Sequence, residues 1–143
     1  MVESLGVKFH LGSCIIEIIK KNISKYCVIL ISDYNKGCIS YELVEQVLQQ
    51  FRGPVFIDTK KTDLARFEGA FVKINSLENS LAKTLPSQCI VTLGKQGCEY
   101  AGQVYPAPQV EVADVCGAGD TFLAALVYQY LKTQQISEAL LFA

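Results

Sequence analysis

The segment 114–121, with the sequence DVCGAGDT, places a glycine-containing turn between two carboxylates. The apolar run 122–131 follows it and predicts that the turn leads straight into a helix. Unpaired backbone N–H groups and the helix dipole favour an anion at such a helix start. Asp120 would repel a bare phosphate, so we interpret it as a base that takes a proton from a hydroxyl group attacking a phosphate. The spacing therefore indicates phosphoryl-transfer chemistry.

The glycine turn has a second interpretation, because G-A-G also occurs as ordinary packing at the start of a helix. The carboxylates of Asp114 and Asp120 favour chemistry, since a carboxylate beside an anion site is typical of a base or a cation ligand. Ordinary helix-start packing stays open as the alternative at this point.

The composition predicts one globular domain spanning residues 1–143. Half of the residues are hydrophobic (50%) and 19% are charged, which is unlike a disordered protein. A chain of this size buries roughly two-thirds of its unfolded surface. The formal net charge of −1 argues against a broad electrostatic footprint for nucleic acid or an anionic membrane. Any bound phosphate must therefore be held locally.

The cysteine pattern favours a cytoplasmic protein. None of the six cysteines forms a C-x-x-C pair and most lie in apolar runs, so we expect reduced core residues and no cysteine metal site. The cysteines are Cys14, Cys27, Cys38, Cys89, Cys98 and Cys116. Residues 1–10 lack the basic start and the long apolar run of a signal peptide, and no stretch approaches transmembrane length.

Apolar periodicity predicts an α/β fold. Helices are expected at 15–23, 40–51, 119–132 and 137–143, and strands at 26–32, 55–58, 70–74 and 89–94, with a hairpin around 97–104. A continuous apolar strand such as 26–32 has no polar face, which is typical of a parallel sheet covered on both sides. Polar residues follow the strands or begin a helix, at the edge where open α/β sheets bind ligands. They are Asp33, Lys36, Asp58, Lys60, Asn75, Glu78, Thr92 and Asp120.

The segment 114–121 resembles the D-[TV]-x-G-A-G-D-[ST] signature of the ribokinase-like (PfkB) family of sugar kinases. Further motifs agree in order: 75–78 resembles N-x-x-E, and 92–97 resembles the nucleotide-binding T-L-G-x-x-G loop. Segments 31–37 and 57–60 are similar to the S-D-Y-x-K-G and D-P-K segments of heptose-phosphate kinases, the kinase half of the ADP-heptose synthase type. The matches span residues 25–141.

The resemblance implies a ribokinase-like three-layer sandwich with a mainly parallel sheet. Family kinases are longer, so we expect an incomplete fold that lacks the N-terminal half and the extreme C-terminus. A truncated reading frame and a genuine short protein are the two explanations. Either one leaves a sheet edge exposed, which predicts a homodimer or larger assembly.

The resemblance also assigns roles residue by residue. Asp120 would be the base, and the backbone of Gly117, Ala118 and Gly119 would form the anion hole. The cofactors implied are ATP and Mg²⁺. The other implied site residues are Asn75 and Glu78 for Mg²⁺ through waters, Asn75, Lys60, Thr92, Gly94 and Gly97 for the nucleotide, Asp33 and Lys36 for the sugar, and Asp114 for a monovalent cation, where Cys116 replaces the usual hydroxyl residue.

Several of these residues have a purely structural alternative. Asn75 can cap a helix with Glu78 in its first turn, residues 92–97 can form a plain turn, and the lysines can be solvated. At the level of function, the first hypothesis is an ATP-dependent kinase acting on a sugar or sugar phosphate. The alternatives are an inactive or truncated remnant that retains the fold and nucleotide binding, and a kinase of another substrate such as a nucleoside or a fructose phosphate.

Overall fold

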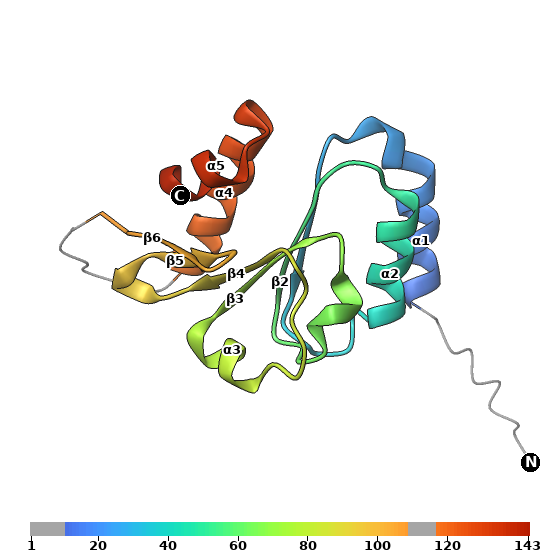
Figure 1. Ribbon diagram of the computed structural model, residues 1–143. Helices are drawn as coiled ribbons and strands as arrows, with labels where there is room; N and C mark the ends of the chain where they lie inside the picture. The colour runs from blue at the N-terminus through green and yellow to red at the C-terminus, as the bar shows by residue number, and fades with distance from the viewer. Residues whose placement is uncertain (1–10, 109–116) are drawn as a thin grey trace, which may run out of the picture.

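The computed structural model describes residues 11–108 and 117–143, and within them six strands form one sheet (Figure 1). In spatial order the strands are β1 (Ile29–Asp33), β2 (Val55–Thr59), β3 (Phe71–Asn75), β4 (Cys89–Thr92), β5 (Cys98–Tyr100) and β6 (Gln103–Tyr105). Strands β1 to β4 are parallel, whereas β5 and β6 are antiparallel to their neighbours. The mainly parallel sheet confirms the predicted fold class.

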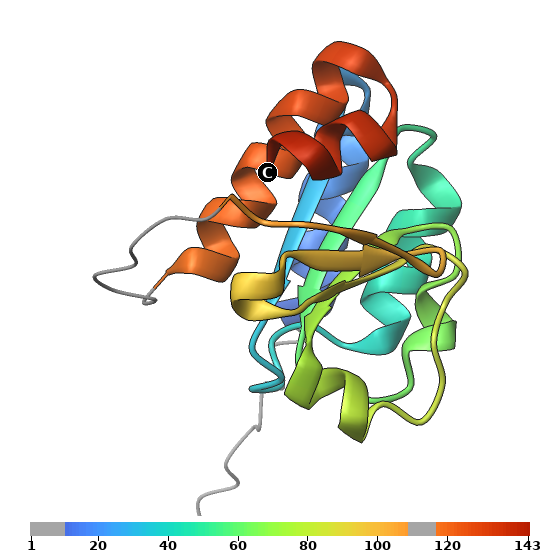
Figure 2. The ribbon, with the colours of Figure 1, turned by 60° about the vertical axis from the view of Figure 1, so that its left-hand side comes forward.

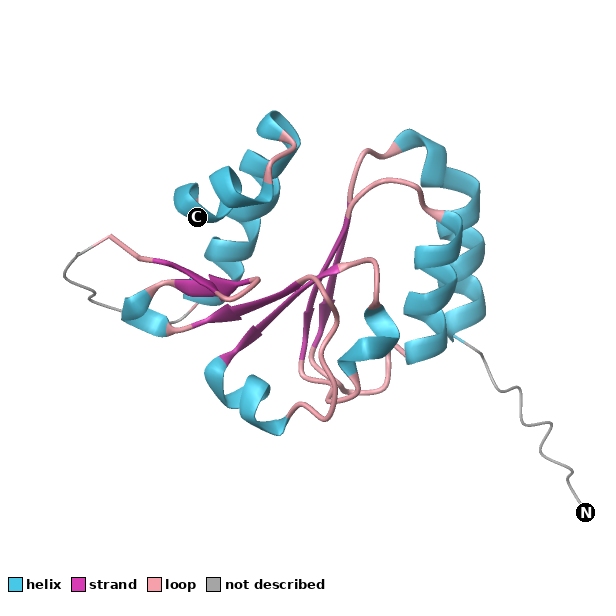
Figure 3. Ribbon diagram, viewed as in Figure 1, coloured by secondary structure: helices cyan, strands magenta, loops and turns pink. Residues whose placement is uncertain are grey.

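Helices on one face of the sheet form the first outer layer (Figure 3). They are α1 (Leu11–Asn22) and α2 (Tyr41–Gln50), accompanied by short 3₁₀ turns η1 (Ile23–Lys25) and η2 (Leu64–Phe67). Helix α2 begins at Ser40, whose Oγ accepts a hydrogen bond of 3.1 Å from the Leu43 N–H. Its apolar stripe of Val44 and Val47 packs into a core that includes Val55 and Ile57 of β2.

The opposite face carries α4 (Ala118–Thr133) and α5 (Ile136–Phe142), which lie across the sheet in Figure 2. Phe56 of β2 points to this side, because successive strand residues alternate between faces. Its ring stacks on Phe71 at 4.9 Å and meets Tyr130 of α4 edge-on at 5.4 Å. A separate core therefore fills each side of the sheet, as a three-layer sandwich requires.

Strand β1 departs from the expectation that a continuous apolar strand is covered on both sides. Among the described residues it is an edge strand, and Leu30 is 49% exposed. Leu30 pairs with Phe56 in the register and lies on the side of α4 and α5, which leave it uncovered. An apolar sequence shows that a strand can be buried, but it does not show whether another element packs on it. Self-association through this exposed edge stays a prediction.

Short connections follow β3, β4 and β5. The predicted hairpin is confirmed: β5 and β6 join through Ala101 and Gly102, both with positive φ (51° and 77°), as the right-handed strand twist prefers. A short helix, α3 (Ser76–Leu81), follows β3, and the 3₁₀ turn η3 (Gly94–Gln96) follows β4. In the described part of the chain no helix combines the length and hydropathy needed to cross a bilayer.

The expectation that the cysteines are core residues is wrong for two of them. Cys27 and Cys38 are exposed, whereas Cys98 is buried and Cys89 is half-buried. Burial raises the pKa of the Cys98 thiol to about 11, and burial with the nearby Glu99 carboxylate raises that of Cys89 to about 11. All four are free cysteines in the structure, and the reduced state of the protein stays a prediction.

These pKa values lead to a test by alkylation. At pH 8 a thiol of pKa 11 is about one part in a thousand thiolate, which is the reactive form. We expect iodoacetamide to label Cys27 and Cys38 at least about a hundredfold faster than Cys98. Peptide mass spectrometry measures the labelling, and the difference should vanish in guanidinium chloride. Equal rates for Cys98 and Cys38 in the folded protein would contradict the described burial.

Candidate active site

A cavity of about 190 Å³ lies where the carboxyl ends of β1, β2 and β3 meet the start of α4. Its lining residues are Ser32, Asp33, Tyr34, Asp58, Lys60, Lys73, Asn75, Glu78, Gly117, Gly119 and Asp120. The polar residues expected at the ends of three strands thus come together with the glycine turn. This is the edge at which open α/β sheets bind ligands.

The glycine turn forms the start of α4. Gly117 adopts a left-handed conformation (φ 77°) that favours glycine, and its carbonyl accepts the N–H of Thr121 at 2.9 Å. Among the described residues, no side chain caps the helix start, so first-turn N–H groups stay available to a ligand. Asp120 lies in this first turn and is exposed. The geometry suits an anion beside a carboxylate that can accept a proton.

Lys73 is a site residue that the sequence analysis missed. It lies in β3 opposite Asp58 of β2, and its Nζ donates to Asp58 Oδ2 at 2.9 Å. A Cβ added to Gly119 would lie 2.8 Å from this Nζ, so the ammonium group reaches the glycine turn of α4. The only signal in the sequence is a lysine inside an otherwise apolar strand. Because an unpaired lysine is costly to bury, a lysine at such a position must have a partner.

Lys61 was missed as well. Its Nζ lies 3.2 Å from Asp33 Oδ2, and both side chains are almost completely buried. Lys61 continues the parity of Val55, Ile57 and Thr59, which are buried, but Phe56 on the opposite parity is buried too, so the strand pattern alone does not single out Lys61. Lys60, on the opposite parity, is exposed over the Tyr34 ring, with Nζ 5.1 Å from the ring centroid.

Asn75 and Glu78 make the contacts of the capping alternative. Asn75 Oδ1 accepts the N–H of Glu78 at 2.8 Å, and Glu78 Oε2 accepts the N–H of Asn75 at 2.8 Å. This reciprocal capping box begins α3 and holds both side chains at the cavity wall. In the described part of the chain, no group of three His, Cys, Asp or Glu side chains is arranged to hold a metal ion directly.

The other predicted residues that the structure describes are not among the residues lining the cavity. Thr92 Oγ1 donates to the Ile74 carbonyl at 3.3 Å, and Gly94 and Gly97 have positive φ (61° and 98°) in the turn after β4. A Cβ on Gly97 would come within 1.9 Å of the Tyr105 carbonyl oxygen, so strand packing alone requires this glycine. The remaining residues are Lys36, which is exposed, Ala118, which is the first residue of α4, and Asp114, which lies outside the described residues.

The capping box yields a stability prediction. Asn75→Ala removes the acceptor for the Glu78 N–H, and we expect the free energy of unfolding to fall by about 1 kcal/mol. Asn75→Ser keeps a capping oxygen and should cost only a few tenths of that. Urea unfolding followed by circular dichroism measures both variants. Equal losses for alanine and serine would contradict a capping role.

Comparison with known proteins identifies a family model and several relatives that match this chain. A family model described as "pfkB family carbohydrate kinase" matches residues 15–143. The "Bifunctional protein HldE" of a Nitratiruptor species is 35% identical over 153 residues, which cover 90% of this chain and 33% of that protein. The protein of the same name from Aliarcobacter butzleri is 30% identical, covering 90% of this chain and 33% of its own length.

A third HldE protein, from Campylobacter curvus, is 29% identical and covers 94% of this chain. The chain spans about a third of the length of these relatives. The family match extends over every described strand, the cavity and the turn at Gly117. The chain therefore belongs to the pfkB family of carbohydrate kinases.

Proposed function

We propose that this chain carries the catalytic part of an ATP-dependent kinase that phosphorylates a hydroxyl group of a sugar phosphate, of the heptose-phosphate type. The observation that carries the proposal is the cavity that unites Asp120 and the glycine turn of α4 with the polar ends of β1 to β3. The HldE relatives and the heptose-kinase-like segments 31–37 and 57–60 support the substrate class.

Asp120 acts as the base in this proposal. Its exposed carboxylate takes the proton from the sugar hydroxyl, and the hydroxyl oxygen forms a bond to the γ-phosphorus of ATP. The bond from that phosphorus to the β–γ bridging oxygen breaks, and ADP leaves with the electron pair. First-turn N–H groups at Gly117, Ala118 and Gly119 stabilise the charge that develops on the transferred group.

The charge of the cavity supports a divalent cation. Four carboxylates line it, and because Lys61 and Lys73 pair with Asp33 and Asp58, the carboxylates of Glu78 and Asp120 are left against the single ammonium group of Lys60. Such a negative lining repels a polyphosphate unless a cation accompanies it. Asn75 and Glu78 supply oxygen ligands of the kind Mg²⁺ prefers, and waters would complete its shell because Mg²⁺ dehydrates reluctantly. The ion would neutralise charge on the transferring phosphate.

The remaining assignments follow the motif order. Lys60, Thr92, Gly94 and Gly97 approach the nucleotide, while Asp33 and Lys36 lie on the sugar side. A remnant without turnover is the competing function. It is distinguished by ADP raising the melting temperature while no sugar phosphate is consumed.

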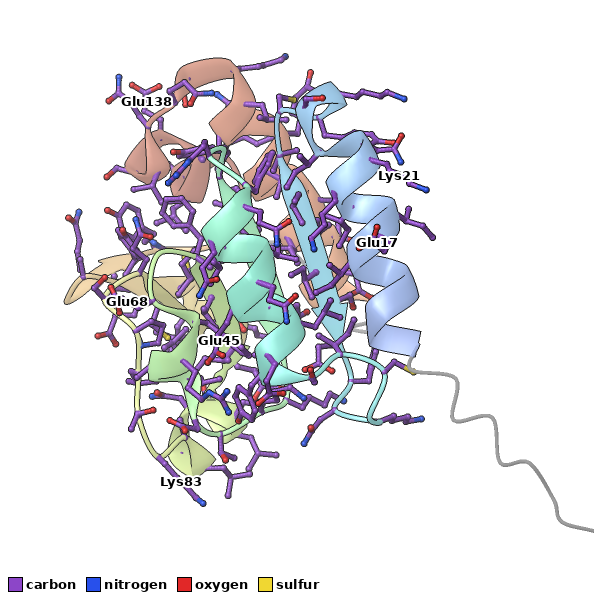
Figure 4. The ribbon with its side chains drawn as sticks, turned by 90° about the vertical axis from the view of Figure 1, so that its right-hand side faces the viewer. Glu17, Lys21, Glu45, Glu68, Lys83 and Glu138 are labelled. Atoms are coloured by element: carbon purple, nitrogen blue, oxygen red, sulfur yellow. The ribbon has the colours of Figure 1, made fainter. Side chains whose placement is uncertain are left out.

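The role of Asp120 is testable with a closely matched control. Asp120→Asn should lower kcat by about a hundredfold to ten-thousandfold, because the base is lost. Glu138 also lies in the first turn of a helix, α5, and at the surface (Figure 4), so Glu138→Gln controls for helix-dipole effects. A coupled ADP-release assay with a heptose phosphate measures both. Undiminished turnover in Asp120→Asn would remove Asp120 from the base role.

Glu78→Gln separates the metal role from the capping role. Glutamine serves equally in a capping box, so the free energy of unfolding should change little. The Mg²⁺ concentration giving half-maximal activity should rise about tenfold or more. A titration of Mg²⁺ at saturating ATP measures this, with Glu138→Gln again as the control. An unchanged Mg²⁺ dependence would leave Glu78 with capping alone.

A further inference from the structure

The ion pair between Lys61 and Asp33 is the most deeply buried charge pair among the described residues, with side chains 6% and 3% exposed. The Lys61 Nζ also donates to Asn35 Oδ1 at 3.0 Å and lies 5.2 Å from the centre of the Tyr41 ring. Such a pair adds little stability, because desolvating both charges offsets most of their attraction. Its presence beside the cavity therefore calls for a role in geometry.

The Asp33 carboxylate is almost fully used by the chain itself. Oδ2 accepts the Thr59 hydroxyl at 2.9 Å and faces Lys61, while Oδ1 accepts the Asn35 N–H at 2.9 Å. A carboxylate offers about four acceptor positions, so three donors leave one unused, on Oδ1. Asp33 lines the cavity, which is where an incoming donor would meet it.

Lys61 also controls the turn after β1. Asn35 adopts a left-handed backbone conformation (φ 55°), which asparagine tolerates better than most residues but less readily than glycine. The bond from Lys61 to the Asn35 side chain and the bond from the Asn35 N–H to Asp33 hold that conformation. The turn places Tyr34 in the cavity lining, so one buried ammonium group orients both Asp33 and Tyr34.

We infer that Lys61 is a positioning residue, which holds Asp33 oriented so that the unused acceptor of Oδ1 binds a hydroxyl group of the sugar. The inference rests on the proposed function and deepens it. A neutral hydroxyl donor fits this position, whereas a phosphate oxygen would be repelled by the carboxylate. Asp33 then contributes to the choice of sugar, and Lys61 contributes only through Asp33.

A double-mutant cycle tests this dependence. Asp33→Asn and Lys61→Met should each raise KM for a heptose phosphate by about tenfold or more, with KM for ATP changed less than about twofold. The double variant should match Asp33→Asn alone, because Lys61 has nothing left to orient. Lys83→Met, at an exposed lysine labelled in Figure 4 and outside the cavity lining, is the control and should leave both constants unchanged.

Folding does not obscure the result. Lys61→Met leaves the Asp33 charge buried and unpaired, whereas the double variant removes both charges and should be the more stable of the two. If Lys61→Met fails to fold, comparison of Asp33→Asn with the double variant still shows whether Lys61 acts only through Asp33. Equal KM values for the sugar support the inference, and a further rise in the double variant overturns it.

A second measurement is independent of turnover. Amide hydrogen exchange of the Asn35 N–H, followed by NMR, should be about tenfold faster in Lys61→Met than in Lys83→Met, since its bond to Asp33 is loosened. An unchanged rate overturns the positioning role. Absence of kinase activity in the unsubstituted chain would instead count against the proposed function, while the exchange rates still decide whether Lys61 positions the turn.

Discussion

Carboxylates at the ends of β1 and β2 are tolerated in this sheet only because a lysine is bonded to each. Asp58 has Lys73, directly opposite it in the register of β2 and β3, and Asp33 has Lys61, which lies two residues beyond its register partner Thr59. Removal of Lys61 would leave the buried Asp33 charge without its cation, which costs more than the intact pair contributes, whereas Asp58 is partly exposed and would lose less with Lys73. The cavity is therefore bounded by side chains that cannot rearrange independently, and the glycine turn of α4 completes its wall.

The arrangement of layers explains why polar groups can gather there at all. Two cores, one on each face of the sheet, hold β2 and β3 from both sides, so their carboxyl ends are fixed relative to α4. Phe56 and Phe71 connect these strands to Tyr130 of α4 through ring contacts. Packing of α4 on the sheet thus sets where Asp120 lies relative to the strand ends, although Asp120 itself is exposed.

The strands of the sheet, and the edge at which its polar residues meet, could be predicted from the sequence. Apolar runs located the strands, and the parallel fold then required Asp33, Asp58 and Asn75 to meet at one edge. Lys61 and Lys73 were not found because composition marks lysine as a surface residue, and only cross-strand register shows what each one pairs with. The exposure of Leu30 could not be predicted from the sequence either, since it depends on which elements cover β1. Local spacing did allow the capping box at Asn75, but could not decide between capping and metal binding.

Gly97 has a consequence for how family motifs are interpreted. Its Cα approaches the Tyr105 carbonyl so closely that no side chain fits, whatever the turn binds. A relative in which this turn bound no ligand would still retain this glycine, because packing against the end of β6 requires it. Gly94 has open space around its Cα and only its backbone angle to favour glycine, so an asparagine there would be tolerated far better. Within this short motif, retention of Gly94 would therefore say more about selection for ligand binding, whereas retention of Gly97 is explained by the packing of the hairpin.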